Sequence, residues 1–352
     1  MRPLPRHLGL RLSGFCAAVL LAAGAAVTLA PAPTASADDG SPDQSFTIKD
    51  PRITESSGLA ASRIHRGIYW THNDSNDGPY VYAVDSRTGE TVATVTMKGI
   101  GSPRDVEAIS IGPDGDIYVG DIGDNLGGKW DHVWIYRFPE PKQLRNETVR
   151  ATQFTVKYAD GPRNAESMMV DPKSGRVYIA SKNEDGGGLY AGPTRLTTSR
   201  TNVFRRIGDV PWVTDGAFSP DGQQLVLRSY FSARSYDWKN GRLGEEHSVS
   251  APFQAQAESV TFTADGSALM FGSEGEDSGV RRVDVAKKEK PEREEPGTGG
   301  KSSPAGGGSP SGTGAGSTGA DDSSDSRTTL GAVVLAGVAA LFFGFRRLRR
   351  KE

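Results

Sequence analysis

The sequence predicts an all-β protein: a β-propeller of five four-stranded blades, followed by a single C-terminal transmembrane helix. Three observations lead to this prediction. Short β-branched and aromatic runs alternate with turn residues, as in chains built only of strands. One signature recurs five times at intervals of 43 to 59 residues, close to the length of a propeller blade. The chain closes with an uncharged apolar stretch and a basic tail.

Residues 1–37 have the pattern of a secretory signal peptide. Three arginines precede an apolar core at 15–30, and Ala35-Ser36-Ala37 fits the small-x-small rule for cleavage. We therefore expect the mature chain to start at Asp38, with an uncleaved anchor as the alternative. Cys16 is the only cysteine and lies in the apolar core, so we expect no disulfide in the mature chain.

The other end of the chain predicts a tether and an anchor. Residues 287–327 are rich in Gly, Ser, Pro and charge, and this composition favours a disordered linker with a reach of about 35 Å. Residues 328–345 are uncharged and would span about 27 Å as a helix. The basic tail at 346–352 predicts a cytoplasmic C-terminus and an extracellular propeller. A cell-wall sorting signal is the alternative, but its Leu-Pro-x-Thr-Gly-like pentapeptide is missing from the sequence.

The charge between the two terminal segments argues against a nucleic-acid partner. Residues 38–345 hold 33 basic and 42 acidic residues, a net charge of −9, whereas binding to nucleic acid favours a basic face. The acidic balance is compatible with cation binding and equally with solubility.

The propeller is expected to occupy residues 38–286. Apolar strand runs and Pro/Asp/Gly turns alternate through this region, with hardly any helical periodicity. The recurring signature is a small or acidic residue, a small residue and then an apolar strand. Its five copies begin at Ser57, Glu107, Glu166, Asp215 and Glu258.

Two features of the repeat leave the blade number open. The last copy has only about three strands before the linker, and Phe46-Thr47-Ile48 would supply the fourth strand and close the ring. The second copy is 59 residues long, which leaves room for a sixth blade. A β-sandwich is the alternative fold, although a signature repeated five times favours the propeller.

The repeat also predicts a site. The first strand of each propeller blade lines the axis, so residues at the same station of different blades converge. Four acids share that station: Glu107, Glu166, Asp215 and Glu258. Oxygen ligands that converge on an axis suit a hard cation, and Ca²⁺ takes six to eight of them. We expect these acids to be candidate calcium ligands. The alternative is structural, with the acids bonding backbone amides of the neighbouring blade.

A second ring of polar residues is expected where the second strands end. Its carboxylates and amides would add cation ligands, and its basic residues would either balance the acids or bind an anionic group. Its candidate ligand-binding members are Asn73, Asp74, Asp121, Asp124, Asn125, Lys182, Arg228, Tyr230 and Glu274.

One local motif is weaker. Asn73-x-Ser75-x-Asp77-Gly78 is similar to the start of an EF-type calcium loop, but Val84 stands where the loop needs its last acid. A polar turn is the simpler interpretation. His72 lies beside these residues, and one histidine does not make a zinc site.

Several phrases carry a family resemblance. They are Glu55-Ser-Ser-Gly-Leu-Ala-Ala-Ser, Trp70-Thr-His-Asn-Asp-Ser, Asp105-Val-Glu-Ala-Ile, Tyr118-Val-Gly-Asp-Ile-Gly-Asp-Asn and Asn164-Ala-Glu-Ser-Met. Over about residues 50–275 the chain resembles secreted bacterial propellers of the SdiA-regulated and phytase-like esterase group, within the wider NHL/WD40-like set. The resemblance implies a propeller with Glu107, Asp121, Asp124, Asn125 and Glu166 in the axial funnel. It does not imply phytase activity, because the acid-rich calcium loops of propeller phytases are not recognisable in this sequence.

Two functions remain open at this point. The chain is expected to be a membrane-tethered binding module for an extracellular ligand, a wall polymer or a protein. The alternative is a calcium-dependent hydrolase of phosphoesters, esters or lactones, with Glu107 or Glu166 as the catalytic base.

Overall fold

The computed structural model describes residues 41–75 and 77–285, which form 21 strands and no helix. The predicted signal peptide lies outside these residues, and so do the linker, the transmembrane helix and the basic tail. The residues that are described contain no helix of the length and apolarity needed to cross a membrane.

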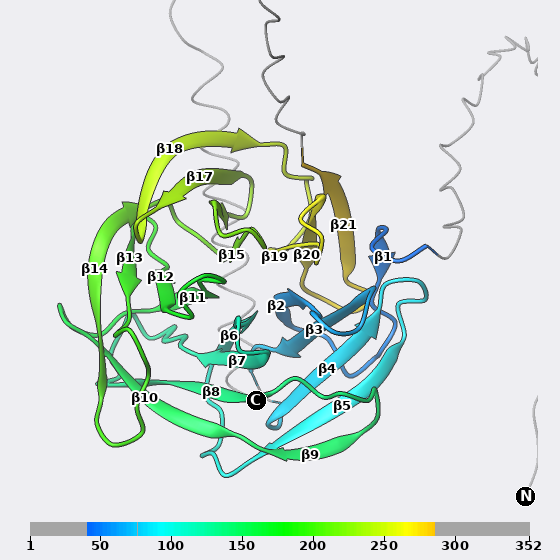
Figure 1. Ribbon diagram of the computed structural model, residues 1–352, viewed down its shortest axis with the longest axis horizontal. Coiled ribbons are helices and arrows are strands. Elements are labelled where there is room, and N and C mark those ends of the chain that lie inside the picture. Colours follow the sequence, from blue (N-terminus) through cyan, green and yellow to red (C-terminus); the bar gives the residue numbers. More distant parts are fainter. Residues whose placement is uncertain (1–40, 76, 286–352) are drawn as a thin grey trace, which may run out of the picture. The chain divides into compact units, whose positions relative to one another are not determined.

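The strands build five four-stranded antiparallel units, here called blades 1 to 5, and the innermost strands contact one another in a closed ring (Figure 1). This is the β-propeller that the repeat predicts. Blade 1 holds β2 (Ser56–Ala61), β3 (Ile68–Asn73), β4 (Tyr80–Asp85) and β5 (Thr91–Lys98); blade 2 holds β6 (Val106–Ile111), β7 (Asp116–Asp121), β8 (Val133–Pro139) and β10 (Thr152–Tyr158); blade 3 holds β11 (Ala165–Val170), β12 (Val177–Ser181), β13 (Gly187–Ala191) and β14 (Asn202–Val210); blade 4 holds β15 (Asp215–Phe218), β16 (Gln224–Arg228), β17 (Ala233–Lys239) and β18 (Arg242–Val249); blade 5 holds β19 (Ala257–Phe262), β20 (Ala268–Ser273), β21 (Gly279–Asp284) and β1 (Phe46–Thr47).

Blade 5 is completed by the N-terminal end of the described chain, as predicted. Strand β1 pairs antiparallel with β21, with Phe46 opposite Val280. The Ile48 amide then donates a hydrogen bond to the Ser278 carbonyl at 2.9 Å. Residues from the two ends of the propeller thus share one sheet, which closes the ring.

This closing segment also rests on blade 1 through Gly89. The Lys49 amide donates to the Gly89 carbonyl at 2.9 Å. Gly89 has a φ of +75°, and a Cβ at this position would lie 1.9 Å from the Thr47 carbonyl oxygen. Only glycine allows both the backbone conformation and the close approach of the two chains.

The long second repeat contains an extra strand and no sixth blade within residues 41–75 and 77–285. Strand β9 (Glu147–Arg150) leaves blade 2 and pairs in parallel with β5 of blade 1. In the same way, β14 of blade 3 pairs in parallel with β10 of blade 2. The additional length of the repeat therefore forms a link between the outer edges of neighbouring blades.

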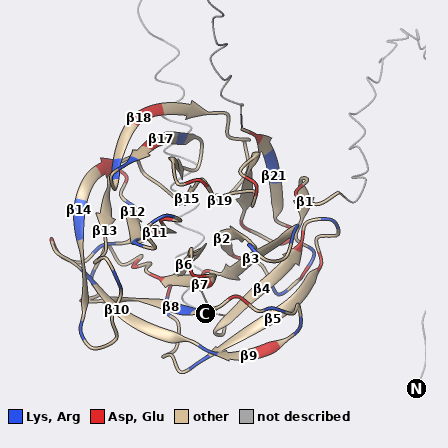
Figure 2. Ribbon diagram, in the orientation of Figure 1, with Lys and Arg blue, Asp and Glu red and all other residues tan. Residues whose placement is uncertain are grey.

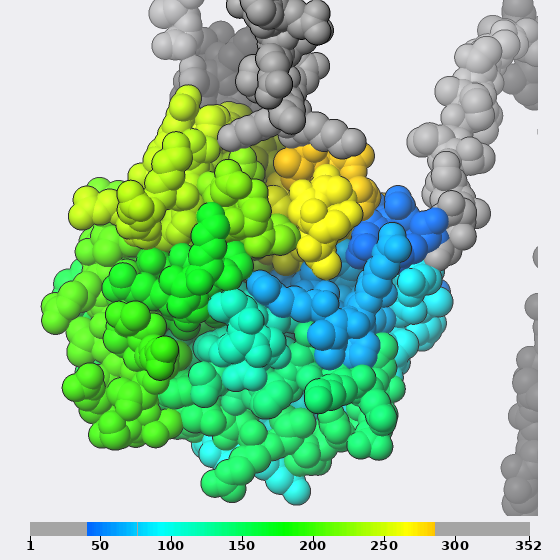
Figure 3. Space-filling view, in the orientation of Figure 1, coloured from blue at the N-terminus to red at the C-terminus, as the bar shows by residue number. Residues whose placement is uncertain are grey.

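Burial decreases from the axis outward. The inner strands β11 and β19 are buried at every residue, whereas the outer strand β18 is intermediate or exposed throughout. The core consists of five apolar clusters, each shared by two adjacent blades. Trp70 and Trp238 are buried in two of these clusters, as expected for blade-packing residues. In the space-filling view the chain order runs round the ring from blue to yellow (Figure 3).

Candidate functional site

Three of the four predicted axial acids lie at β-bulges. Pairing between β6 and β7 runs from Val106 to Ala108 and skips Glu107, and the same shift skips Glu166 in β11 and Glu258 in β19. A bulge bends the strand and changes the direction of the extra side chain. Each of these glutamates is 1% exposed. Acidic positions occur beside the inner strands near the middle of the ring (Figure 2).

The three bulged glutamates act on one ammonium group, that of Lys182. Lys182 follows β12, and its Nζ lies 2.9 Å from Oε2 of Glu166. Burial alone would lower the pKa of Lys182, but electrostatic interactions with Glu166, Tyr230, Glu258 and Glu107 raise it well above its usual range. The side chain of Lys182 is therefore a buried cation at the point where acids of blades 2, 3 and 5 converge.

Tyr230 of blade 4 completes the surroundings of this ammonium. Its hydroxyl oxygen accepts a hydrogen bond from Lys182 Nζ at 2.8 Å, and its ring centroid lies 5.0 Å from the same nitrogen. Trp212 packs edge-on against the tyrosine ring at 5.3 Å. Burial, followed by the charge of Glu258, raises the pKa of Tyr230, so its hydroxyl stays protonated near neutral pH.

A second group of acids lies where blades 1 and 2 meet. Asp74 follows β3, Asp105 precedes β6, and Glu107 lies in β6; each offers a carboxylate oxygen within 4.8 Å of the other two. All three are buried. The Val106 amide donates to the Asp74 carbonyl at 2.8 Å and fixes the two segments side by side. Three carboxylate oxygens at this spacing fit the preference of a hard cation such as Ca²⁺.

Two asparagines position Asp105, the acid of this trio that precedes β6. Asn125 Nδ2 donates to Asp105 Oδ2 at 3.1 Å, and Asn164 Nδ2 donates to Asn125 Oδ1 at 3.3 Å. The predicted ligand Asn125 thus lies behind Asp105 and orients it.

Asp121 and Asp124 hold the surrounding loops. The Asp121 carboxylate accepts the amides of Arg104 and Asp105 at 3.1 and 3.0 Å and the Tyr136 hydroxyl at 2.6 Å. Asp124 accepts the Trp130 amide at 2.5 Å. Asp121 therefore fixes the segment that carries Asp105, and Asp124 fixes its own loop before β8.

Asp215 occurs without a bulge, and its contacts differ from those of the glutamates. Its carboxylate accepts the Val260 amide of blade 5 at 2.8 Å and the Gly216 amide at 2.7 Å. Burial raises the pKa of Asp215 well above its usual range, although both amide bonds act in the opposite direction. The Asp215 carboxylate therefore bonds the backbone of the neighbouring blade.

Arg228 also joins blades 4 and 5. Its Nη1 donates to the carbonyls of Ser259 and Gly272, each at 2.5 Å, and its Nη2 donates to Gln254 at 2.8 Å. Burial lowers the pKa of Arg228 to about 10, against the charges of Glu258 and Asp215. The guanidinium thus bonds two backbone carbonyls and the Gln254 side chain of blade 5, and it shares Glu258 with Lys182 as an electrostatic partner.

The remaining candidates lie at the edge of these groups. Asn73 Oδ1 accepts the amides of Thr54 and Glu55, both at 3.0 Å, and therefore fixes the chain before β2. Glu274 accepts a hydrogen bond from Gln256 in blade 5 at 3.1 Å.

The EF-like segment forms a local turn. Asp77 accepts Asn73 Nδ2 at 2.8 Å, the Tyr82 hydroxyl at 2.9 Å and the Gly78 amide at 2.7 Å. These three donors bond the acid within its own hairpin.

Sequence reasoning missed Asp105 and Asn164 as site residues. The available signal for Asp105 was its spacing: it stands two residues before Glu107, as Glu55 stands two residues before Ser57. Its contact with Asp74 of another blade has no signal in the sequence.

No protein-family model matches this sequence, and no curated protein is similar to it. Solved structures with a similar fold include hydrazine synthase of Kuenenia stuttgartiensis, at 17% identity and a TM-score of 0.37 over 63% of this chain. This chain spans only 56% of that one. Another is a gluconolactonase of Xanthomonas campestris, at 13% identity and a TM-score of 0.41, covering 68% of this chain and 89% of the other. These likenesses concern the fold alone.

Proposed function

We propose that this propeller is a cation-dependent binding module for an anionic, oxygen-rich extracellular ligand. The observation that carries the proposal is the buried trio of Asp74, Asp105 and Glu107, whose oxygens lie within 4.8 Å of one another. Buried like charges at this distance disfavour one another's ionised form, and a bound divalent cation would offset that cost. Calcium suits the trio best, because it accepts carboxylate oxygens in flexible geometry and takes further oxygens from water or ligand.

Lys182 supports the anionic part of the ligand. Its raised pKa keeps the ammonium charged at neutral pH, and Glu107 is among the groups that raise it. The trio and the ammonium therefore share one electrostatic environment. A carboxylate or phosphate group would find a cation on each side, and charge-assisted hydrogen bonds to such groups are strong.

The experiment is a melting series of the full chain in EDTA and with calcium, magnesium or manganese. Calcium at about one hundred times its Kd should stabilise the folded protein by about 2.7 kcal/mol, or roughly 5 to 10 °C in Tm. Glu107→Gln should remove most of this response, because a neutral amide is a weaker ligand. Glu140→Gln is the matched control: Glu140 is also buried, and it bonds Ser62 and Trp70 instead of the trio. An equal response in both variants would reject the trio as the cation site.

A catalytic use of the same site is our second candidate. The ammonium of Lys182 and the hydroxyl of Tyr230, both kept protonated, offer two donors to a developing oxyanion, and Glu166 lies beside them as a base. The test is hydrolysis of p-nitrophenyl phosphate, p-nitrophenyl acetate and a simple lactone, with calcium and with EDTA. Glu166→Gln should abolish turnover while the variant still melts cooperatively. No turnover with any of these substrates favours the binding module.

We also propose that the chain is exported and anchored with the propeller outside the cell, and that it belongs to the SdiA-regulated and phytase-like esterase group. The signal-like start, the apolar stretch at 328–345 and the quoted motifs support these proposals. Protease treatment of intact cells should remove the propeller and leave a C-terminal tag protected. A wall polymer or a protein is the partner class we would test first.

A further inference from the structure

The axis has a cavity at the other ends of the inner strands. It has a volume of about 290 Å³, and every blade contributes to its wall. Glu107, Glu166 and Glu258 are the second residues of their strands, whereas the cavity is lined by later residues of the same strands and, in the part of the chain that the structure describes, by no acid. In β6 the lining begins at Ile109, two residues and about 7 Å along the strand from Glu107. The cavity is therefore separate from the acid site.

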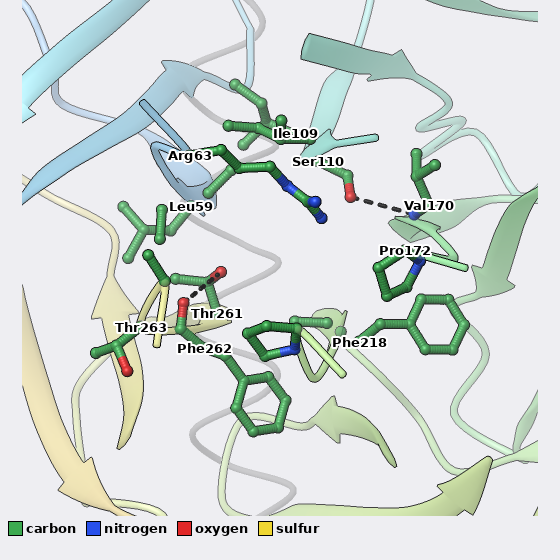
Figure 4. A pocket seen from close by; sticks show the side chains of 17 residues that line it. Leu59, Arg63, Ile109, Ser110, Val170, Pro172, Phe218, Thr261, Phe262 and Thr263 are labelled. Carbon is green, nitrogen blue, oxygen red and sulfur yellow. Dashed lines mark hydrogen bonds between the residues drawn. The ribbon is translucent and has the colours of Figure 1, made fainter. Parts of the chain in front are cut away.

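Arg63 is the one charged residue in the described lining of this cavity. It lies in the turn between β2 and β3, and its guanidinium extends into the middle of the cavity, toward Ser110 (Figure 4). Arg63 is solvent-exposed, so a ligand can reach it. Phe218 and Phe262 belong to the opposite side of the lining, and their rings point away from its centre (Figure 4). Phe262 is 4% exposed, and the Phe218 ring packs on Trp238 at 4.9 Å.

The turn that carries Arg63 is held in place by Glu140. This buried carboxylate accepts the Ser62 hydroxyl at 2.5 Å, the Trp70 indole N–H at 2.8 Å and the Arg63 backbone amide at 3.3 Å. Ser62 Oγ in turn accepts the His65 amide at 2.8 Å. Glu140 thus bonds the backbone at Arg63, and no salt bridge of the Arg63 side chain is found within residues 41–75 and 77–285. Burial lowers the pKa of the Arg63 guanidinium, and the charges of Glu140 and Asp114 act in the opposite direction.

The rest of the lining is apolar with a few hydroxyls. Ser110 Oγ accepts the Val170 amide at 3.1 Å, and Thr261 Oγ1 donates to the Phe262 carbonyl at 3.4 Å. Ile109 and Val170 add aliphatic surface. A single cation among apolar walls suits a monoanion with an apolar body; a free phosphate dianion would require more donors.

We propose that this cavity binds a small organic carboxylate, with its carboxylate on Arg63 and its apolar part against the apolar wall around Ala217. A guanidinium can bond both oxygens of a carboxylate at once. A volume of about 290 Å³ suits a compact ligand.

The test is calorimetric titration of the full chain with benzoate and hexanoate, against benzamide and inorganic phosphate as probes. We expect saturable binding of the two carboxylates and at least tenfold weaker binding of benzamide and phosphate. Arg63→Gln should weaken carboxylate binding at least tenfold. Arg66→Gln is the matched control, since Arg66 is an exposed arginine of the same turn that does not line the cavity.

A second variant keeps the test independent of the folding of Arg63→Gln. Ala264 lies exposed at the cavity rim, so Ala264→Phe should block the cavity and Ala264→Ser should not. Unchanged benzoate binding in Arg63→Gln or Ala264→Phe, or equal binding of benzamide, would overturn the proposal. The calcium response should persist in Arg63→Gln, which separates this site from the acid trio.

Discussion

Nζ of Lys182 lies 2.9 Å from Oε2 of Glu166, and both side chains are almost fully buried, at 5% and 1% exposure. The pair joins the end of one strand of blade 3 to the bulge of another. Removing one partner of an ion pair buried in this way leaves an uncompensated charge in the interior, which destabilises the fold. The integrity of the pair therefore affects folding and the site together.

Replacement of Lys182 by Met should destabilise the protein by about 3 to 5 kcal/mol, because Glu166 would keep a buried charge without its partner. The double variant Lys182→Met, Glu166→Gln should recover part of this loss. Urea unfolding of the three proteins measures the difference. Lys239→Met is the control: Lys239 pairs with Asp237 at 3.6 Å but is 78% exposed, and its loss should cost less than about 1 kcal/mol. An equal cost in both lysine variants would contradict the role of burial.

Asp215 should prove important for stability and unimportant for the calcium response. Asp215→Ala leaves the buried amides of Val260 and Gly216 without their acceptor, at a cost of about 2 to 4 kcal/mol. Asp209→Ala, which removes an acid 88% exposed, should have little effect. Unfolding curves and calcium titration of both variants provide the measurement. If Asp215→Ala abolished the calcium response, Asp215 would be a ligand, as its place in the repeat suggested.

The closing segment should contribute strongly to the stability of the whole ring. Ile48 is 1% exposed and packs in the cluster shared by blades 5 and 1. Ile48→Ala should cost about 3 kcal/mol through lost burial and a residual cavity. Lys49→Ala, at the exposed neighbouring position, should change the free energy of unfolding by less than about 0.5 kcal/mol. A small effect at Ile48 would mean that the ring is stable without its N-terminal strand.

His72 should make the fold sensitive to acid. Burial lowers the pKa of His72 to about 4, from an ordinary value of 6.5. Between these values the unfolded chain binds a proton that the folded chain does not, so stability falls as the pH decreases from 6.5 to 4. His72 alone should lower the free energy of unfolding by about 1.4 kcal/mol for each pH unit, or by about 3 kcal/mol over the whole range.

The measurement is the difference in this slope between the native protein and His72→Gln, from urea unfolding at several pH values. Because both proteins contain the same other titrating groups, the contributions of those groups cancel when one slope is subtracted from the other. NMR titration of the His72 ring gives the folded pKa directly. Parallel slopes in the two proteins, or a ring that titrates near 6.5, would show that His72 is not held neutral by burial.

The sequence predicted the strands well because each is a short apolar run between turn residues. The five signatures became the five inner strands, and Phe46 and Thr47 supplied the closing strand. The second repeat remained ambiguous. Its surplus length forms β9, which pairs with another blade, and the pattern within one repeat carries no information about a partner strand.

The axial acids show the same limit. Four residues at one station of the repeat were expected to form one set, yet only Glu107, Glu166 and Glu258 lie at bulges and act on Lys182. Asp215 bonds the amide of Val260. A bulge depends on how two strands align. The presence of an acid in the sequence therefore does not tell in which direction its side chain points.

By itself, the sequence determined the β-propeller class, the five repeats and the chemical character of the axis. Local propensity and period are sufficient for these, because each depends on residues close together in the chain. The tertiary structure alone decided which acids meet, that Asp105 joins Asp74 and Glu107, and that Arg63 faces a separate cavity. Those relationships depend on contacts between blades, which form only when the ring closes.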